Sequence, residues 1–169
     1  MKEIEIKKSM GLLDYESSIK FMETRVKNIQ NSSESELIWF LNHQHIYTQG
    51  TSAKNNEIIK LNQISVIKSN RGGKTTYHGP GQRIVYFLLN LNKRKKDIRK
   101  FISIVEDSLI SFLKNYNIEA QSFKDRVGIW VFKSDKKTFD IERKIGAIGL
   151  RVSKWITYHG LSFNINPDL

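Results

Sequence analysis

Residues 70–82 form the stretch of the chain whose residue types are best suited to chemistry. Its sequence, NRGGKTTYHGPGQ, sets four glycines beside Arg71, Lys74 and His78. Glycine lets backbone N–H groups approach a ligand closely, so such a loop can hold a phosphate, a carboxylate or a carbonyl oxygen. A plain strand connection needs only one or two glycines. We therefore predict a functional loop here, since functional residues concentrate on loops.

The letters GGKTT suggest a nucleotide site, but their spacing excludes a P-loop. That motif requires a glycine five residues before the glycine that precedes its lysine, and Lys68 stands there. The chain also contains no G-x-G-x-x-G and no G-x-S-x-G. The usual dinucleotide-binding and serine-hydrolase signatures are therefore absent.

A second stretch, residues 143–166, brings a lysine next to small and apolar residues. Lys144 is followed by IGAIG, and a poorly hydrated lysine has a lowered pKa that approaches the range of a general base. The alternative is a lysine at the start of a strand whose ammonium simply reaches water. Gly146 and Gly149 favour close approach of a ligand or of another backbone segment. His159 and the glycine after it repeat the His-Gly pair of the first loop.

The histidines give a weaker indication. His43 and His45 are two residues apart and would share a strand face, which would allow metal binding. The chain has no cysteine and no helical histidine pair, so we expect packing or loop hydrogen bonds and no metal site.

Composition narrows the class of protein. The chain has 169 residues, of which 39% are hydrophobic, enough for one domain with a sizeable core. Zero Cys excludes disulfides, thiolate metal sites and a cysteine nucleophile on these residues. The net charge of +11 suggests an acidic partner. The KRKK run at residues 93–96 is a solvated face or a docking patch for such a partner. No signal peptide or membrane-spanning run is evident, so a cytoplasmic location is expected.

The elements that must position these residues follow from hydrophobic periodicity. A helical stripe is predicted over residues 15–29, with Asp14 as its N-cap, and a stronger one from Asp97 to Tyr116. Seven strands are expected at residues 4–6, 37–41, 64–67, 83–91, 127–132, 144–152 and 156–165. Because helices and strands do not alternate regularly, we predict an α+β fold, a mixed sheet with packed helices, in a single domain spanning 1–169.

At these motifs the chain resembles a known family. RGGKTTYHGPGQ (residues 71–82) and KIGAIGLRVSKWITYHGLSFNIN (residues 144–166) are similar to the lipoyl(octanoyl) transferases, as are NHQHIYTQG (residues 42–50) and DRVGIWV (residues 125–131). The resemblance covers essentially the whole chain. It implies the fold of the lipoate and biotin protein ligase catalytic domain, with no cofactor.

The resemblance also implies a reaction and its residues. An octanoyl group would pass from octanoyl-acyl carrier protein through a cysteine thioester to a lysine amine of lipoyl domains, on 2-oxoacid dehydrogenase complexes and the glycine cleavage H protein. Lys144 would be the catalytic lysine that accepts protons. Acyl-binding positions would be Arg71, Gly72, Gly73, Lys74, Thr75, Thr76, Tyr77, His78, Ala147, Ile148, Gly149, Gly160, Leu161 and Ser162.

One departure from the family affects activity. The family's nucleophilic cysteine lies in a Pro-Cys-Gly-like segment a little beyond an N-x-(x)-D-L stretch, which falls here at residues 166–169. We therefore expect a C-terminal portion to be missing, because Lys144 and the glycine-rich loop are intact. The alternative is a shortened protein that cannot form the acyl-enzyme. In either case the 169-residue chain itself is expected to be inactive. Ser162 has no evident triad and is not expected to replace the thiol.

Two other functions stay open. An ATP-dependent lipoate or biotin protein ligase would share the fold and would need no cysteine. A basic nucleic-acid-binding domain is compatible with the charge and with 18 aromatic residues. Charge without a recognised motif is weak support for the latter, so neither nucleic acid nor membrane is an expected partner.

Overall fold

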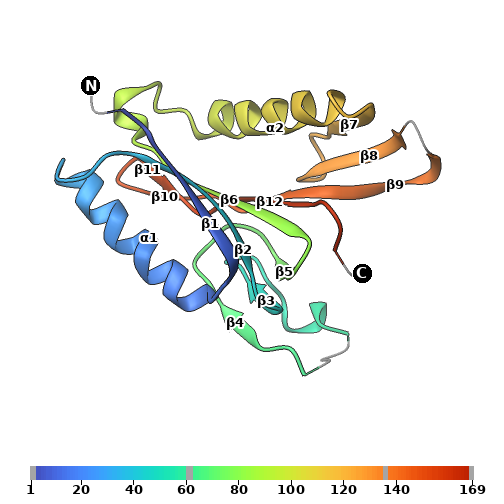
Figure 1. The fold of residues 1–169 in the computed structure, drawn as a ribbon, viewed down its shortest axis with the longest axis horizontal. Helices are drawn as coiled ribbons and strands as arrows, with labels where there is room; N and C mark the ends of the chain where they lie inside the picture. Colours follow the sequence, from blue (N-terminus) through green and yellow to red (C-terminus); the bar gives the residue numbers. More distant parts are fainter. Residues whose placement is uncertain (1–2, 60–62, 135–136, 168–169) are drawn as a thin grey trace. The chain divides into compact units, whose positions relative to one another are not determined.

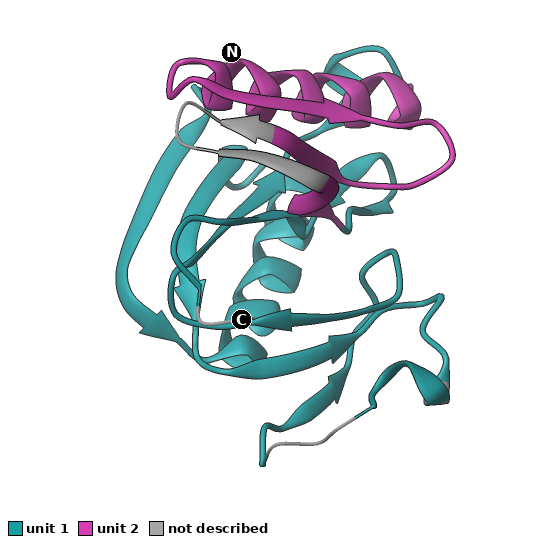
Figure 2. Cartoon of the chain, turned by 90° about the vertical axis from the view of Figure 1, so that its right-hand side faces the viewer, with its two compact units in different colours: residues 1–96, 149–169 teal, residues 97–148 magenta. Residues whose placement is uncertain are grey.

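The computed structural model describes residues 3–59, 63–134 and 137–167. The chain forms two compact units, coloured separately in Figure 2. Unit 1 consists of residues 1–96 and 149–169, and unit 2 consists of residues 97–148. Met1 and Lys2, and Asp168 and Leu169 of the family-like C-terminal stretch, lie outside the described residues.

Unit 1 contains one long helix and most of the strands (Figure 1). In chain order its elements are β1 (Glu5–Leu13), α1 (Tyr15–Gln30), β2 (Leu37–His43), β3 (Ile46–Gln49), the 3-10 helix η1 (Asn55–Glu57), β4 (Val66–Lys68), β5 (Thr75–His78), β6 (Gln82–Leu88), the 3-10 helix η2 (Leu91–Lys93), β10 (Arg151–Ser153), β11 (Ile156–Tyr158) and β12 (Gly160–Asn164).

The strands of unit 1 form a mixed sheet and two smaller sheets. The main sheet has the order β1-β2-β6-β12, in which β1 and β2 are parallel and the other neighbours antiparallel. A second sheet has the order β4-β3-β5, and β10 pairs with β11. The predicted α+β class with a mixed sheet and packed helices is confirmed.

Helix α1 forms where the 3.6-residue apolar stripe predicts it. Asp14 caps its N-terminus, because the carboxylate accepts a 2.8 Å hydrogen bond from the backbone N–H of Ser17. The apolar face packs into a core of buried residues from α1, β2, β6 and β11: Met22, Val26, Ile29, Leu37, Trp39, Leu41, Ile84, Tyr86, Leu88, Ile156 and Tyr158.

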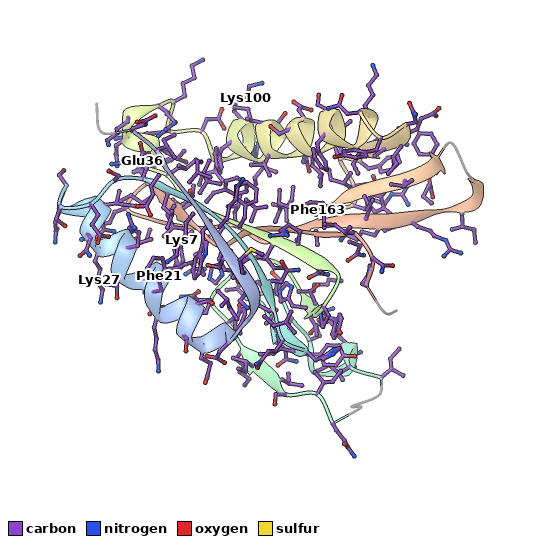
Figure 3. The ribbon with its side chains drawn as sticks, in the orientation of Figure 1. Lys7, Phe21, Lys27, Glu36, Lys100 and Phe163 are labelled. Carbon is purple, nitrogen blue, oxygen red and sulfur yellow. The ribbon has the colours of Figure 1, made fainter. Side chains whose placement is uncertain are left out.

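Strand β1 connects to the same helix through its side chains. The Nζ of Lys7 lies 4.1 Å from the ring centroid of Phe21 on α1 and 4.9 Å from that of Trp39 on β2. Figure 3 labels Lys7 and Phe21 among the side chains of unit 1. An ammonium held over aromatic faces is a favourable cation–π arrangement, which secures β1 against the helix.

Unit 2 pairs one helix with an antiparallel sheet. Its elements are α2 (Ile98–Lys114), β7 (Ile118–Ser122), β8 (Ile129–Ser134) and β9 (Lys137–Ile148), with the sheet order β9-β8-β7. Asp97 caps α2 by accepting a 2.9 Å hydrogen bond from the N–H of Lys100. The buried residues of the helix are Phe101, Val105, Leu109 and Leu113. The predicted helix after Asp97 is therefore confirmed.

Several predicted strands were wrong in extent. The strand expected to reach Leu91 ends at Leu88, because Asn90 caps η2, its side chain accepting a hydrogen bond from the N–H of Asn92. The strand expected over 156–165 divides at His159, whose φ of +57° interrupts the extended backbone. The strand expected over 144–152 ends at Ile148 and begins already at Lys137, so Lys144 lies inside β9 and not at its start.

Three of the observed strands, namely β3, β5 and β7, were not predicted from the sequence.

The KRKK side chains at residues 93–96 are exposed, as predicted. Among the described residues, no helix has both the length and the apolar character needed to cross a membrane.

Candidate active site

The glycine-rich loop of unit 1 is organised by the buried side chain of Arg71, which is 7% exposed. Its guanidinium donates hydrogen bonds to Oγ1 and the backbone carbonyl of Thr48 on β3 (3.0 and 2.5 Å), and to the carbonyls of Gly72 and Lys74 (2.8 and 2.7 Å). Burial lowers the pKa of Arg71 from its ordinary value. The side chain therefore fastens the loop to β3 from inside, using most of its five donors.

Two further side-chain bonds hold the residues that precede Arg71. The hydroxyls of Tyr15 on α1 and Ser69 are 2.8 Å apart. Oδ1 of Asn70 accepts a 2.8 Å hydrogen bond from Nε2 of His159. Ser69, Asn70 and Arg71 are therefore each held by a side-chain hydrogen bond, which fixes the backbone at the start of the loop.

Glycine is required where this loop meets the backbone at residues 149–150. A Cβ on Gly72 would lie 2.8 Å from the carbonyl oxygen of Leu150, and one on Gly149 would lie 3.1 Å from the carbonyl oxygen of Gly72. The N–H of Gly149 donates to the carbonyl of Gly160 (2.8 Å). Three segments predicted from sequence, at residues 71–73, 149 and 160, therefore converge within unit 1.

Free backbone donors remain on the loop. Within the described part of the chain, the N–H groups of Gly72 and Gly73 have no hydrogen-bond acceptor. Gly73 and Lys74 are exposed. Such N–H groups can bind a carbonyl oxygen or an oxyanion, as the sequence predicted for this loop.

The remaining predicted positions of unit 1 lie in strands that border the loop. Thr75, Thr76, Tyr77 and His78 form β5, which pairs with β3. The hydroxyl of Tyr77 is 2.5 Å from Nδ1 of His45. Leu161 and Ser162 are buried in β12 (7% and 6% exposed).

Three buried histidines lie behind these strands. Nδ1 of His43 is 3.0 Å from the carbonyl of Leu13, and its Nε2 is 2.7 Å from the hydroxyl of Tyr86. The ring of His43 lies 5.9 Å from that of His78, and the ring of Tyr86 lies 6.1 Å from that of His159. Burial lowers the pKa of His43, and it lowers the pKa values of His78 and His159 to about 3. All three rings are therefore neutral at pH 7.

The hydrogen-bond directions assign the proton on two of these rings. Nε2 of Gln82 donates to Oδ1 of Asn164 (3.0 Å), so Oε1 of Gln82 accepts from Nδ1 of His78 (2.7 Å). His159 donates through Nε2, and its buried Nδ1 has no partner among the described residues. These hydrogen bonds fix the orientation of both rings.

The expectation that His43 and His45 share a strand face was wrong. His43 is the last residue of β2 and is fully buried, whereas His45 lies in the turn before β3 and is exposed. Among the described residues, no group of three or more His, Cys, Asp or Glu side chains could hold a metal ion.

Lys144 belongs to unit 2, where a bulge in β9 sets its direction. Ile129 on β8 pairs with Gly146, but the next residue, Trp130, pairs with Lys144, so Ile145 is the extra residue. Directly paired residues share a sheet face, and a shift of one residue changes the face. The bulge therefore moves Lys144 onto the face of Trp130. In a regular ladder Lys144 would pair with Val131, which is buried (6% exposed).

The environment of Lys144 perturbs its titration. Nζ lies 5.5 Å from the centroid of the Trp130 ring. The side chain keeps exposed surface, yet desolvation of the ammonium lowers the pKa of Lys144 from its ordinary value. Ala147 and Ile148, also predicted as acyl-binding, follow it at the end of β9 in unit 2.

Several residues that hold the loop or surround the candidate site could not be identified from the sequence. Tyr15 belongs to an apolar helical stripe and was interpreted as core, and no signal marked Thr48 as the acceptor for Arg71. Tyr86 lies within an apolar strand run. Gly128, which precedes β8, could have been identified, because a glycine next to a strand often marks a place where another group approaches closely.

Comparison with known proteins identifies the family. Residues 14–169 match the model of the lipoyl protein ligase A/B catalytic domain. An octanoyltransferase of Bartonella bacilliformis is 44% identical over 170 residues, covering 98% of this chain and 70% of the relative. For an octanoyltransferase of Brucella melitensis these values are 41% over 163 residues, 94% and 62%. The chain thus spans roughly two thirds of the length of these relatives.

Solved structures agree on the fold. A bipartite lipoate protein ligase from Thermoplasma acidophilum superposes with a TM-score of 0.68 at 15% identity, covering 99% of this chain and 64% of that one. A lipoate-protein ligase A bound with ATP gives 0.63 at 16% identity, covering 97% and 68%. At these identities the likeness concerns the fold alone. Together with the family model and the octanoyltransferase relatives, it confirms the predicted resemblance: the chain belongs to the lipoyl protein ligase A/B catalytic domain family.

Proposed function

We propose that residues 1–169 are part of one catalytic domain of an octanoyltransferase, which moves an octanoyl group from octanoyl-acyl carrier protein to a lysine amine of lipoyl domains. The observation that carries the proposal is the 44% identity to an octanoyltransferase over 98% of this chain. The 2-oxoacid dehydrogenase complexes and the glycine cleavage H protein would supply the lipoyl domains. The net charge of +11 suits an acidic carrier protein as donor.

The glycine-rich segments of unit 1 would bind the acyl group. The free N–H groups of Gly72 and Gly73 would donate to the carbonyl oxygen of the thioester, whose negative charge grows as the carbonyl is attacked. Arg71 contributes by holding the loop in shape, since its own donors already bind Thr48, Gly72 and Lys74.

Lys144 would act as the proton acceptor. With its pKa lowered by desolvation, a larger fraction of the amine is neutral near pH 7 and can take a proton. In the first step it would accept the proton of a thiol that attacks the thioester carbonyl carbon. As the bond between that carbon and the carrier sulfur breaks, Lys144 would return the proton, and the carrier would leave as a thiol. In the second step the substrate amine would form the amide, and its proton would pass to Lys144 as the thiolate departs.

The thiol itself must come from outside these residues, since they contain no cysteine. The proposal therefore predicts a division of activity. The complete protein transfers octanoate, whereas residues 1–169 alone bind the acyl group without turnover.

The test incubates the complete protein and residues 1–169 separately with octanoyl-acyl carrier protein and an unmodified lipoyl domain. Intact-mass spectrometry should reveal an octanoyl amide on the lipoyl domain with the complete protein only. A Lys144→Met variant of the complete protein should lose about 100-fold or more in rate, the usual contribution of a general base. A folded complete protein without amide transfer would refute the proposal.

A ligase activity has one specific observation in its favour, namely the fold likeness to a lipoate-protein ligase bound with ATP. A parallel reaction with lipoate and ATP, without carrier protein, tests it directly. Modification of the lipoyl domain in that reaction would replace the transferase proposal with a ligase.

A further inference from the structure

We propose that Gly128 is a positioning residue for Lys144, because the missing side chain at position 128 leaves the space across which the Lys144 stem lies. Gly128 immediately precedes β8, and the β9 bulge puts Lys144 on the sheet face of Trp130. Gly128 lies outside β8, but a Cβ built on it would meet the side chain of Lys144, so it lies on the side of the sheet that Lys144 occupies. The bulge determines which sheet face Lys144 occupies, and the missing side chain of Gly128 determines how closely the Lys144 side chain approaches the backbone before β8.

The fit between the two residues is close. A Cβ on Gly128 would overlap Cε of Lys144 and would lie 3.0 Å from Nζ. Gly128 is buried even though the preceding Val127 is 64% exposed, as expected if the lysine stem covers it. The φ of +123° at Gly128 is also a conformation that side chains rarely adopt.

The consequence is electrostatic. A stem that lies against the β8 backbone brings the ammonium towards the Trp130 ring and removes part of its hydration, although the residue remains exposed. This partial desolvation is the cause of the lowered pKa of Lys144. The charged neighbours on this face do not cancel the lowering of the Lys144 pKa, for which desolvation is the cause. Arg126 stacks on the Trp130 ring at 4.7 Å and pairs with Glu142 at 2.9 Å. Helix α2 carries Glu106, whose pKa responds to Ser122 and Asp107 and not to Lys144.

An alanine side chain at position 128 would meet two groups. The lysine stem is flexible and can swing outwards, so relieving that overlap is cheap. The carbonyl oxygen of Gly146 lies 2.7 Å from the same Cβ and belongs to the ladder, so the backbone at residue 128 must also shift locally. In a Gly128→Ala variant the ammonium is therefore pushed into water, and its pKa rises towards the ordinary lysine value of about 10.4.

The experiment follows the ¹³Cε and ¹Hε resonances of Lys144 by NMR during a pH titration of the whole chain, with the assignment taken from Lys144→Arg. In the unmodified protein we expect a nuclear Overhauser effect between the Gly128 Hα and Lys144 Hε protons. In Gly128→Ala we expect the pKa of Lys144 to rise. Gly11→Ala is the matched control, because Gly11 also has a positive φ (+73°) but nothing within 4 Å of its added Cβ. The pKa of Lys144 should not move in that control.

Either of two results would overturn the inference: no Overhauser effect in the unmodified protein, or an unchanged pKa of Lys144 in folded Gly128→Ala. If Gly128→Ala does not fold, the Overhauser effect in the unmodified protein decides alone. The inference rests on the proposed function only for its meaning in catalysis. Because neither readout uses activity, absence of octanoyl transfer would overturn that function and leave the positioning role standing.

Discussion

Acidification should destabilise unit 1 through two buried histidines. His78 and His159 are 6% and 1% exposed, and burial lowers the pKa of each to about 3, below its ordinary value of 6.5. Between those values the unfolded chain binds protons that the folded chain excludes. The free energy of unfolding therefore rises with pH across this window and falls as the pH drops below 6.5.

The size of the effect follows from the width of the window. A pH of 5 lies about 1.5 pH units below the ordinary histidine pKa of 6.5, and each unit costs about 1.4 kcal/mol of unfolding free energy per histidine. Each histidine therefore lowers the free energy of unfolding by about 2 kcal/mol at pH 5. The pair therefore costs about 4 kcal/mol, against a typical total stability of about 5–15 kcal/mol. His43, whose pKa is also lowered by burial, acts in the same direction.

The carboxyl groups affect this window less. The ion pair with Arg94 helps hold the pKa of Glu36 below its ordinary 4.5, so its contribution is lost only at more acidic pH. Burial raises the pKa of Glu106, whose protonation on acidification would oppose the loss of stability. Comparing variants that keep both carboxyl groups cancels these contributions.

The assay is urea unfolding at pH 7.5 and pH 5, followed by circular dichroism. The unmodified chain should lose at least about 4 kcal/mol on acidification. A His78→Asn/His159→Asn double variant should lose about 4 kcal/mol less, keeping the contribution of His43. Asparagine tolerates the positive φ of His159. The control is His45→Asn, which replaces an exposed ring and should keep the full loss. An equal pH dependence in the double variant and the unmodified chain would refute the reasoning.

Three other substitutions test the packing and the loop. Met22→Ala should cost about 2–5 kcal/mol in urea unfolding because Met22 is fully buried, whereas Met10→Ala, at a residue 91% exposed, should cost almost nothing. Arg71→Lys removes the guanidinium fork and should lower stability by about 1–3 kcal/mol, since carbonyls of Thr48, Gly72 and Lys74 lose donors; a cost near zero would mean that water replaces it. In the complete protein, Gly72→Ala should raise the KM for octanoyl-acyl carrier protein about tenfold, about 1.4 kcal/mol, because its Cβ would press on the carbonyl of Leu150. An unchanged KM, measured beside Gly11→Ala in the same complete protein, would contradict a role for this close approach.

The helices and their caps could be predicted from local sequence. The spacing of Tyr15, Met22 and Val26 identifies the buried face of α1, and Asp14 and Asp97 cap the helices where the sequence predicts. Helical periodicity is a property of neighbouring residues, so it can be recognised without knowing the rest of the fold. The glycine-rich loop and Lys144 also stood out by composition.

Strand extents could not be predicted as well. The run from residue 156 to residue 165 looks continuous, but His159 turns out of the strand to donate to Asn70, a residue far away in sequence. Thr75–His78 looks like loop and becomes β5 because β3 provides its partner. Strand pairing joins distant segments, so its limits depend on partners that local sequence does not name.

By itself, the sequence determined which residues are available for chemistry: a glycine-rich loop, a lysine beside apolar residues, no cysteine, and the motifs of a known family. The tertiary structure decided how they are held. Arg71 binds the loop carbonyls from inside, three histidines are buried and neutral, and one extra residue in β9 moves Lys144 onto the face of Trp130. The physical reason is that burial and strand register, which set charge state and direction, arise only when distant segments pack together.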